Sequence, residues 1–204
     1  MADIKENSAS IQRHGQRAAS IVSNMTQYTN AGQGYPQPTD LNGLVAEALR
    51  LSCHSIRARE QGFSVAIDTE YDASMGQVDL VASDMSRALI NIIENAYYAL
   101  HAKHAKLNQT FVPTLEVKTQ RKNSSVEICI RDNGFGITPE IEEKIFSPFF
   151  TTKPPGEGTG LGLSLAHDIV VGQHQGTLSV EVDLGSYTEF IITLPSKNQA
   201  GASV

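Results

Sequence analysis

The sequence of 204 residues contains no tryptophan, only two cysteines and no apolar run of 18 or more residues. Without such a run, nothing in this chain is expected to span a membrane. The opening residues also lack the basic-then-apolar pattern of a secretion signal, so we expect a cytoplasmic protein. Cys53 and Cys129 lie far apart without a C-x-x-C pattern, which favours two reduced, buried thiols over a disulfide.

Basic residues are few as well. Sixteen Lys and Arg against 22 Asp and Glu give a formal net charge of -6, which argues against a nucleic-acid footprint. Hydrophobic residues make up 40% of the chain and charged residues 19%, as in ordinary globular proteins. The length suits one well-packed domain with an appendage.

The appendage is a predicted long helix from about Ser8 to Asn30. Apolar or packing residues recur in it at alternating steps of three and four: Ile11, His14, Ala18, Ile21, Met25 and Tyr28. This is the a/d seam of a helix that packs along another helix. We expect a partner helix or a second copy of the chain, rather than solvent, to cover the seam.

The composition changes after this helix and divides the chain into three parts. The run from Ala31 to Pro38 is rich in Gly, Pro and polar residues and predicts an interdomain linker. We therefore expect a helix and the start of a linker in residues 1–34, the main domain in residues 35–195, and a disordered tail in residues 196–204.

The main domain mixes helical and strand patterns. Helices are predicted after an N-cap at Thr39 or Asp40, from about Ala82 to Ala102, and from Leu161 to Val171. Alternating patterns predict strands at Phe63–Thr69, Thr114–Thr119, Val126–Arg131, Gly176–Val182 and Thr188–Leu194. The order lacks regular β-α-β alternation, so it predicts an α+β fold with helices on one face of a mixed sheet.

A polar stripe runs along the helix that begins near Ala82. Arg87, Asn91, Asn95 and Tyr98 follow one another at steps of four, four and three, so they share one side of the helix. Asparagine oxygen is a suitable ligand for Mg²⁺. The alternative is that neighbouring backbone groups satisfy both asparagines.

Two glycine motifs follow. The first, Asp132-Asn133-Gly134-Phe135-Gly136, ends a strand and could place a carboxylate at the bottom of a pocket, although such residues also favour simple turns. The second, from Gly156 to Leu163, has alternating glycines that lead into a helix, an arrangement suited to phosphate oxygens. It is neither a Walker A loop nor a dinucleotide-binding fingerprint.

Between the glycine motifs lies an aromatic segment that ends at Lys153. Its phenylalanines, Phe146, Phe149 and Phe150, could anchor a mobile lid or pack in the core. Lys153 could reach a phosphate as a point charge, or it could be a solvated lysine.

In this order the motifs resemble those of histidine kinases in the GHKL ATPase superfamily. Leu89–Ala96 resembles the N box, Asp132–Gly136 the first glycine box, Phe146–Phe150 the F box and Gly158–Leu163 the second glycine box. Thr188–Pro195 resembles the final strand of that domain. The resemblance covers roughly Asp40 to Pro195.

The resemblance implies a Bergerat α/β sandwich that binds ATP and Mg²⁺. It implies that Asn95 ligates Mg²⁺, that Asn91 lies near the phosphates, and that Asp132 accepts a hydrogen bond from the adenine amino group. The other residues that it assigns to the nucleotide site are Gly134 and Gly136 around the base, Gly158, Thr159, Gly160, Leu161 and Gly162 at the lid and phosphates, and Thr188 near the base.

The chain departs from the family pattern at three places. Tyr98 stands where many members have a basic residue, which makes Lys153 the candidate for that phosphate contact. His174-Gln175-Gly176 replaces the common His-Gly-Gly, a change expected to alter only a turn. No histidine shows the acid and proline of a phosphoacceptor, and His14 on the seam is interpreted as a packing residue.

The segment from Ile11 to Tyr28 resembles the second helix of a dimerisation and phosphoacceptor hairpin. The implied function is therefore transfer of the γ-phosphoryl group of Mg·ATP to a histidine on a helical domain largely absent from this chain, within two-component signalling. The implied partners are that helical domain, a response regulator and a second copy joined through the N-terminal helix. We expect the fragment to bind ATP without labelling itself efficiently.

Two other functions fit parts of the pattern. Related ATP hydrolases place a glutamate one turn before the metal-binding asparagine, where this chain has Asn91, and Glu94 lies about 100° around the helix from Asn95. A nucleotide-free interaction module would recognise a response regulator or dimerise through the N-terminal helix. ATP binding would distinguish the second alternative from the others.

Overall fold

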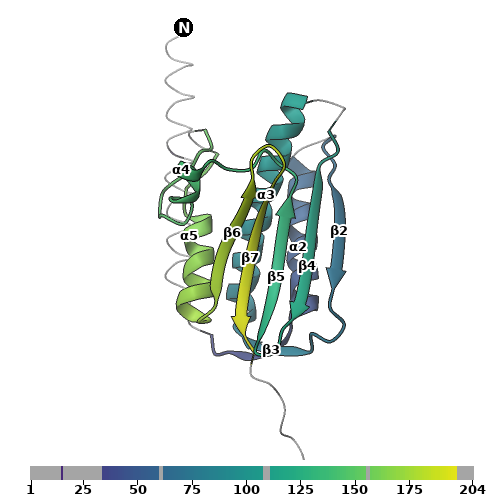
Figure 1. Cartoon of the computed structure of the whole chain (residues 1–204), viewed down its shortest axis with the longest axis vertical. Coiled ribbons are helices and arrows are strands. Elements are labelled where there is room, and N and C mark those ends of the chain that lie inside the picture. Colours follow the sequence, from purple (N-terminus) through teal and green to yellow (C-terminus); the bar gives the residue numbers. More distant parts are fainter. Residues whose placement is uncertain (1–14, 16–33, 60–61, 108–110, 155–156, 197–204) are drawn as a thin grey trace, which may run out of the picture.

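The computed structural model describes residue 15 and residues 34–59, 62–107, 111–154 and 157–196 (Figure 1). The predicted helix between Ser8 and Asn30, except for Gly15, lies outside this part of the chain, and so does the predicted tail beyond Ser196. Among the described helices, none is both long and apolar enough to cross a membrane.

A mixed five-stranded sheet forms one layer of the domain. Its strands, in spatial order, are β2 (Ala66–Tyr71), β4 (Thr114–Arg121), β5 (Ser125–Asp132), β7 (Tyr187–Pro195) and β6 (Thr177–Asp183). β2 pairs with β4 in parallel, and the other neighbours are antiparallel. Side chains of β5 and β7 alternate between buried and half-buried positions, as expected for strands covered on one face.

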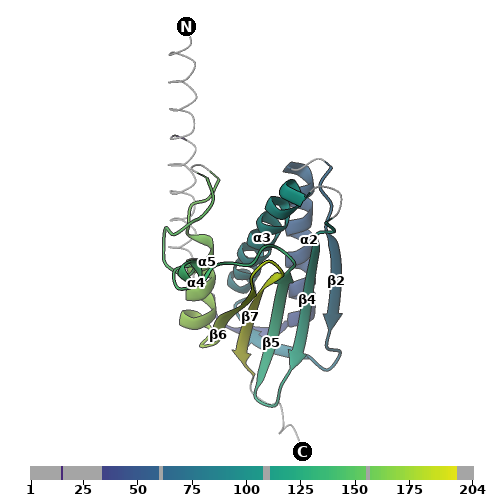
Figure 2. The ribbon, with the colours of Figure 1, turned by 45° about the horizontal axis from the view of Figure 1, so that its top comes forward.

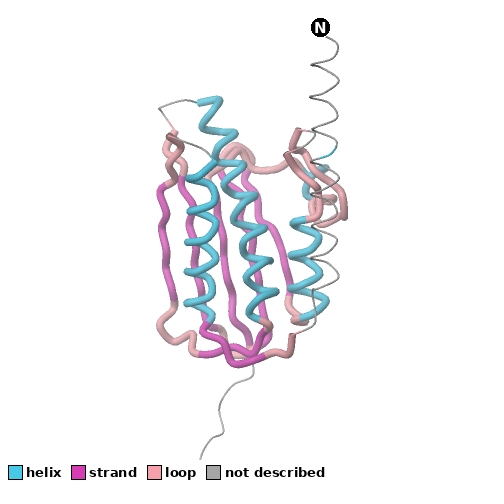
Figure 3. Tube along the Cα trace, turned by 180° about the vertical axis from the view of Figure 1, so that it is seen from behind, coloured by secondary structure: helices cyan, strands magenta, loops and turns pink. Residues whose placement is uncertain are grey.

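Helices form the second layer and lie on one face of this sheet (Figures 2 and 3). They are α2 (Leu41–Arg59), α3 (Ala82–Leu107) and α5 (Gly162–His167), which continues into the π-helix η2 (Asp168–Gln173). The core between the layers includes Ile92 and Leu100 of α3 and Ile128 and Ile130 of β5, all at most 1% exposed. The predicted α+β layering is confirmed.

Local chemistry explains where α2 begins. An Asp40 carboxylate oxygen accepts the N–H of Gly43 at 3.1 Å, the bond of an N-cap residue to the third helical position. Asp40 rather than Thr39 is therefore the cap. α3 extends five residues beyond the predicted Ala102, and the first residue of this extension, Lys103, is buried.

The predicted linker was wrong at its end. Its last residues belong to β1 (Gln37–Asp40), which pairs antiparallel with β3 (Gln77–Leu80), a strand that the sequence pattern did not predict. Four residues are too few for a clear alternating pattern, although Val78 and Leu80 are both buried.

The predicted tail was wrong at its first residue. Ser196 is 8% exposed; its N–H donates to Ser124 O at 2.9 Å, and its hydroxyl accepts from Arg121 at 3.2 Å. The ordered chain after β7 therefore extends one residue further than the polar composition of the tail indicated.

The predicted helix Leu161–Val171 is present as α5 and η2, and His174 anchors its end. The His174 Nε2 accepts the N–H of Val81 at 3.0 Å, and its Nδ1 lies 2.8 Å from Ile169 O. A neutral ring with the proton on Nδ1 satisfies both contacts. The next residue, Gln175, has φ 54°, a left-handed conformation that glycine adopts more easily, so glutamine stands here at a position whose backbone favours glycine. That the departure from His-Gly-Gly alters this turn stays a prediction.

Candidate nucleotide-binding site

One cavity of about 720 Å³ gathers most of the predicted site residues. It lies between α3, the ends of β5 and β7, and the chain leading into α5. The predicted residues that line it are Asn91, Asn95, Tyr98, Asp132, Lys153, Gly158, Thr159, Gly160, Leu161, Gly162 and Thr188. Residues from four separate sequence motifs thus meet in one place.

Gly134 and Gly136 do not line the cavity and lie behind its Asp132 end. A Cβ on Gly134 would come within 2.4 Å of an Asp132 oxygen and 3.1 Å of Ala99 Cβ. Gly136 has φ 72°, and a Cβ there would meet Asp183 O at 3.0 Å. Both positions therefore require glycine for the loop to pack under the carboxylate.

Asp132 is a buried carboxylate at one end of the cavity. It ends β5, stands opposite Thr188 of β7, and both residues are at most 4% exposed. One oxygen accepts the Gly134 N–H at 2.9 Å, the one hydrogen bond to this carboxylate within the described residues. The group therefore keeps acceptor capacity for a ligand donor.

Burial raises the pKa of Asp132 to about 7. The Gly134 N–H and the positive charge of Lys103 oppose this shift but do not cancel it. The group is therefore balanced between its neutral and ionised forms near neutral pH, an unusual state for an aspartate.

Lys103 supports this end of the cavity and was not identified from the sequence. It is 7% exposed, and its ammonium donates to the carbonyls of Asn133, Gly134 and Gly185, each at 2.8 Å. The charge also lies 5.4 Å from the centre of the Phe135 ring. The sequence did contain one indication of this role. Lys103 falls three residues after Leu100, on the apolar face of the helix, and a lysine on a buried face needs buried hydrogen-bond partners.

At the other end, α3 presents its asparagines to the glycine-rich segment. A Cβ on Gly162 would lie 3.4 Å from the Asn91 side-chain oxygen, so the start of α5 packs directly beside α3. Gly160 has φ 69°, and a Cβ there would overlap the carbonyl group of Phe149. These glycines permit a close approach that other residues would block.

Lys153 reaches across the cavity to α3. Its ammonium donates to the Asn95 side-chain oxygen at 2.9 Å and lies 4.6 Å from the centre of the Tyr98 ring. Burial lowers the pKa of Lys153, while the negative charges of Glu94 and Glu157 oppose that shift. Lys153 is half-buried and lines the cavity, a placement that favours a position in the site over a solvated lysine, and its contact with phosphate stays a prediction.

Glu94 also lines the cavity, next to Asn95. The helical rotation between adjacent residues led us to expect it to point away, but the cavity is wide enough to include both side chains. Phe146 and Phe150 pack against the core, whereas Phe149 is 63% exposed. The aromatic segment therefore divides between core packing and solvent.

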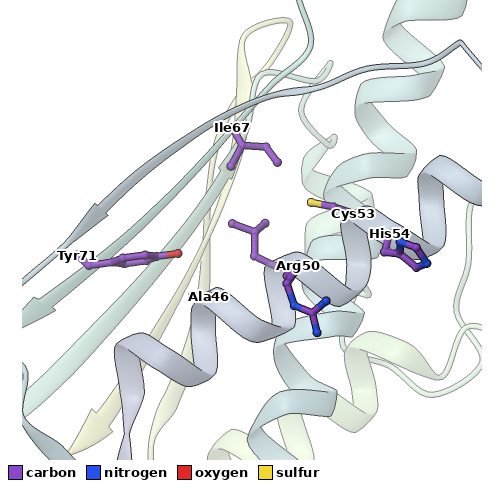
Figure 4. A pocket seen from close by; sticks show the side chains of 7 residues that line it. Ala46, Arg50, Cys53, His54, Ile67 and Tyr71 are labelled. Carbon is purple, nitrogen blue, oxygen red and sulfur yellow. The ribbon is translucent and has the colours of Figure 1, made fainter.

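A second, smaller cavity of about 390 Å³ lies between α2 and β2 (Figure 4). Ile67 and Tyr71 reach into it from the strand, opposite Cys53 of α2. Its charged member, Arg50, is already bound to Glu47 at 2.6 Å. It offers no glycine-rich backbone and no buried carboxylate for a nucleotide.

The donor set suits a metal held mainly by substrate. No group of three or more His, Cys, Asp or Glu side chains that could hold a metal is found among the described residues. Magnesium commonly takes one or two protein oxygens and completes its shell with phosphates and water. The side-chain oxygen of Asn95, which accepts a hydrogen bond from the Lys153 ammonium, fits such a site.

The comparison with protein families gives the same assignment. Residues 81–198, more than half of the chain, match the family described as histidine kinase-, DNA gyrase B- and HSP90-like ATPase. The chain belongs to this family. The match includes both glycine motifs and the asparagine helix, so the ATP-binding domain that the motifs predicted is confirmed.

Relatives within the family are sensor histidine kinases. The chain is 31% identical to the signal transduction histidine-protein kinase AtoS of Escherichia coli over 90% of this chain and 28% of that protein. It is 29% identical to the sensor kinase CckA of Brucella abortus over 91% of this chain and 20% of that protein. The chain thus spans about a quarter of these relatives.

A solved structure agrees in fold. The catalytic domain of the histidine kinase ThkA superposes with a TM-score of 0.65 at 27% identity, over 80% of this chain and 99% of that domain. The mixed sheet with helices on one face is therefore that of a histidine-kinase catalytic domain.

Proposed function

We propose that this domain binds Mg·ATP and transfers the γ-phosphoryl group to a histidine of a helical domain in two-component signalling. The observation that supports this proposal most directly is the single cavity with a buried carboxylate, Asp132, at one end and a polar, glycine-rich end that includes Asn95. Such a cavity has an acceptor for a base and N–H donors for phosphates.

The two ends take different parts of the nucleotide. Asp132 accepts a hydrogen bond from the amino group on C6 of adenine, beside Thr188, whereas guanine carries a carbonyl acceptor at C6. Gly134 and Gly136 keep the loop close beneath it. Asn95 holds Mg²⁺, which when bound neutralises phosphate charge, and Asn91 lies beside the phosphates with Lys153 and the segment from Gly158 to Gly162.

The transfer joins the γ-phosphorus to a ring nitrogen of histidine and breaks its bond to the oxygen that bridges to the β-phosphate, so ADP leaves. The attacking nitrogen uses its lone pair and carries no proton, and the proton on the other ring nitrogen passes to a base on the domain that carries the histidine. The residues of this chain position the phosphates and exclude water, which is the main contribution that a protein makes to such transfers.

The partners follow from the same proposal. They are the phosphoacceptor helical domain, a response regulator, and a second copy that pairs through the predicted helix in residues 1–34. Residues 35–195 then form the catalytic domain. Because cells keep their ATP in the cytoplasm, we place the domain there, and its net charge of -6 fits partners other than nucleic acid.

Phosphoryl transfer is tested by incubating the chain with γ-labelled Mg·ATP, alone and with a histidine-bearing helical hairpin from a sensor kinase. We expect acid-labile label on the hairpin and little on the chain. Asn95→Ala is expected to lower the rate by about 100-fold or more, because the metal loses its protein ligand. Strong self-labelling of the chain, or label that resists acid, would contradict the proposal.

Nucleoside binding is expected to depend on pH through Asp132. Since its pKa is raised to about 7, the ionised fraction grows from about 10% at about pH 6 to about 90% at about pH 8. The carboxylate is the stronger acceptor, so adenosine affinity should rise several-fold over this interval. Calorimetry with adenosine avoids titrating phosphates, and Asp132→Asn should give a flat profile. A flat profile in the wild type would contradict the assignment.

ATP hydrolysis is the alternative that the position of Glu94 keeps open, since this side chain lines the cavity beside Asn95. Its test is phosphate release without a hairpin present. If the chain releases phosphate and Glu94→Gln abolishes this release, the result would favour a hydrolase. If Glu94→Gln leaves phosphoryl transfer to the hairpin intact, the result favours the kinase.

A further inference from the structure

Tyr98 departs from the family pattern, and its contacts suggest what it does. The aromatic ring lies one helical turn after Asn95 on the same side of α3, and both line the cavity. An uncharged phenol cannot replace a basic residue in binding phosphate. Its ring face can, however, attract a cation supplied by another segment.

That cation is the ammonium of Lys153. It lies 4.6 Å from the Tyr98 ring centre and 2.9 Å from the Asn95 oxygen. The backbone around it is shaped to fit, because the Lys153 N–H donates to Thr151 Oγ1 at 3.1 Å and a Cβ on Gly158 would come within 3.1 Å of the Lys153 side chain. The lysine is thus enclosed by ring, amide and glycine.

We infer that Tyr98 is a positioning residue that holds the Lys153 ammonium on Asn95, so that the nucleotide-free site already contains a positive charge where the phosphates bind. This inference rests on the proposed function. Many members of the family have a basic residue at the position of Tyr98 on α3. In this chain the positive charge comes from Lys153 on another segment, and Tyr98 holds it in place.

One consequence concerns the order of events at Asn95. The side-chain oxygen that accepts from Lys153 is the same atom proposed to ligate Mg²⁺. The ammonium and the metal ion repel each other. We therefore expect the Lys153 ammonium to leave this oxygen when Mg·ATP binds and to move onto the phosphate oxygens. Adenosine has no phosphates and leaves the contact in place.

The experiment is NMR of the lysine ε-methylene groups in the nucleotide-free protein, with Lys153→Arg identifying the signal. We expect the Lys153 protons to be shifted upfield by the Tyr98 ring current, relative to the exposed Lys144. The shift should persist in Tyr98→Phe, which keeps a ring, and disappear in Tyr98→Leu. Adenosine should leave it unchanged, and Mg·ATP should change it.

Affinity gives a second measurement. Tyr98→Leu should weaken ATP binding by about two- to fivefold, the size expected for one cation–ring contact, while adenosine binding stays constant. A Lys153 signal at the Lys144 position in the wild type, or one unaffected by Tyr98→Leu, would overturn the inference. A wild type that binds no ATP would instead refute the proposed function, while the nucleotide-free spectrum would still decide the role of Tyr98.

Discussion

Asp132→Ala is expected to weaken ATP binding by about 10- to 100-fold, because a hydrogen bond to a charged acceptor contributes about 1.5–3 kcal/mol. Asp132 is 2% exposed, and its bond to Gly134 leaves acceptor capacity free. Water cannot replace the missing acceptor easily in so enclosed a place. Calorimetric titration with ATP and Mg²⁺ measures the loss.

Selectivity makes this test sharper. The wild type should prefer ATP to GTP, and the alanine variant should lose most of that preference, since adenine carries an amino donor on C6 where guanine carries a carbonyl acceptor. Asp68→Ala removes an exposed carboxylate from β2 and serves as the matched control for net charge. A folded Asp132→Ala protein that binds ATP as tightly as the wild type would refute the adenine assignment.

Lys103→Met is expected to lower the free energy of unfolding by about 2–4 kcal/mol, since it leaves buried carbonyls without a donor. The ammonium binds three of them, on Asn133, Gly134 and Gly185, each at 2.8 Å. Methionine can fill the volume but cannot donate. Urea unfolding of the nucleotide-free protein measures the change.

The same substitution should loosen the loop beneath Asp132 and weaken ATP binding, even under conditions in which the protein stays folded. Lys106→Met is the matched control, because Lys106 is exposed on the same helix and also lies near the Phe135 ring, at 5.1 Å from its centre. Equal destabilisation by the two variants would show that charge, rather than the three buried hydrogen bonds, accounts for the effect.

Features that depend on neighbours along the chain were predictable. Asn91, Asn95 and Tyr98 share a side of α3 because the helical period alone places them there. Asp132 is the last residue of β5, because the alternating strand pattern stops there and a glycine-containing turn motif follows. The order of these motifs along the chain was enough to predict the fold family.

Contacts between distant segments were decided by the tertiary structure. Lys103 donates hydrogen bonds to the carbonyl groups of Gly134 and Gly185, which lie 31 and 82 residues away along the sequence. Lys153 donates to Asn95, from which it is separated by 58 residues. A single-sequence pattern shows that a polar residue falls on a buried face or in a loop, but not which partner meets it. Pairing across the fold depends on how the helices pack on the sheet, and that packing places the Lys103 ammonium on three carbonyl groups and the Lys153 ammonium on the Asn95 side chain.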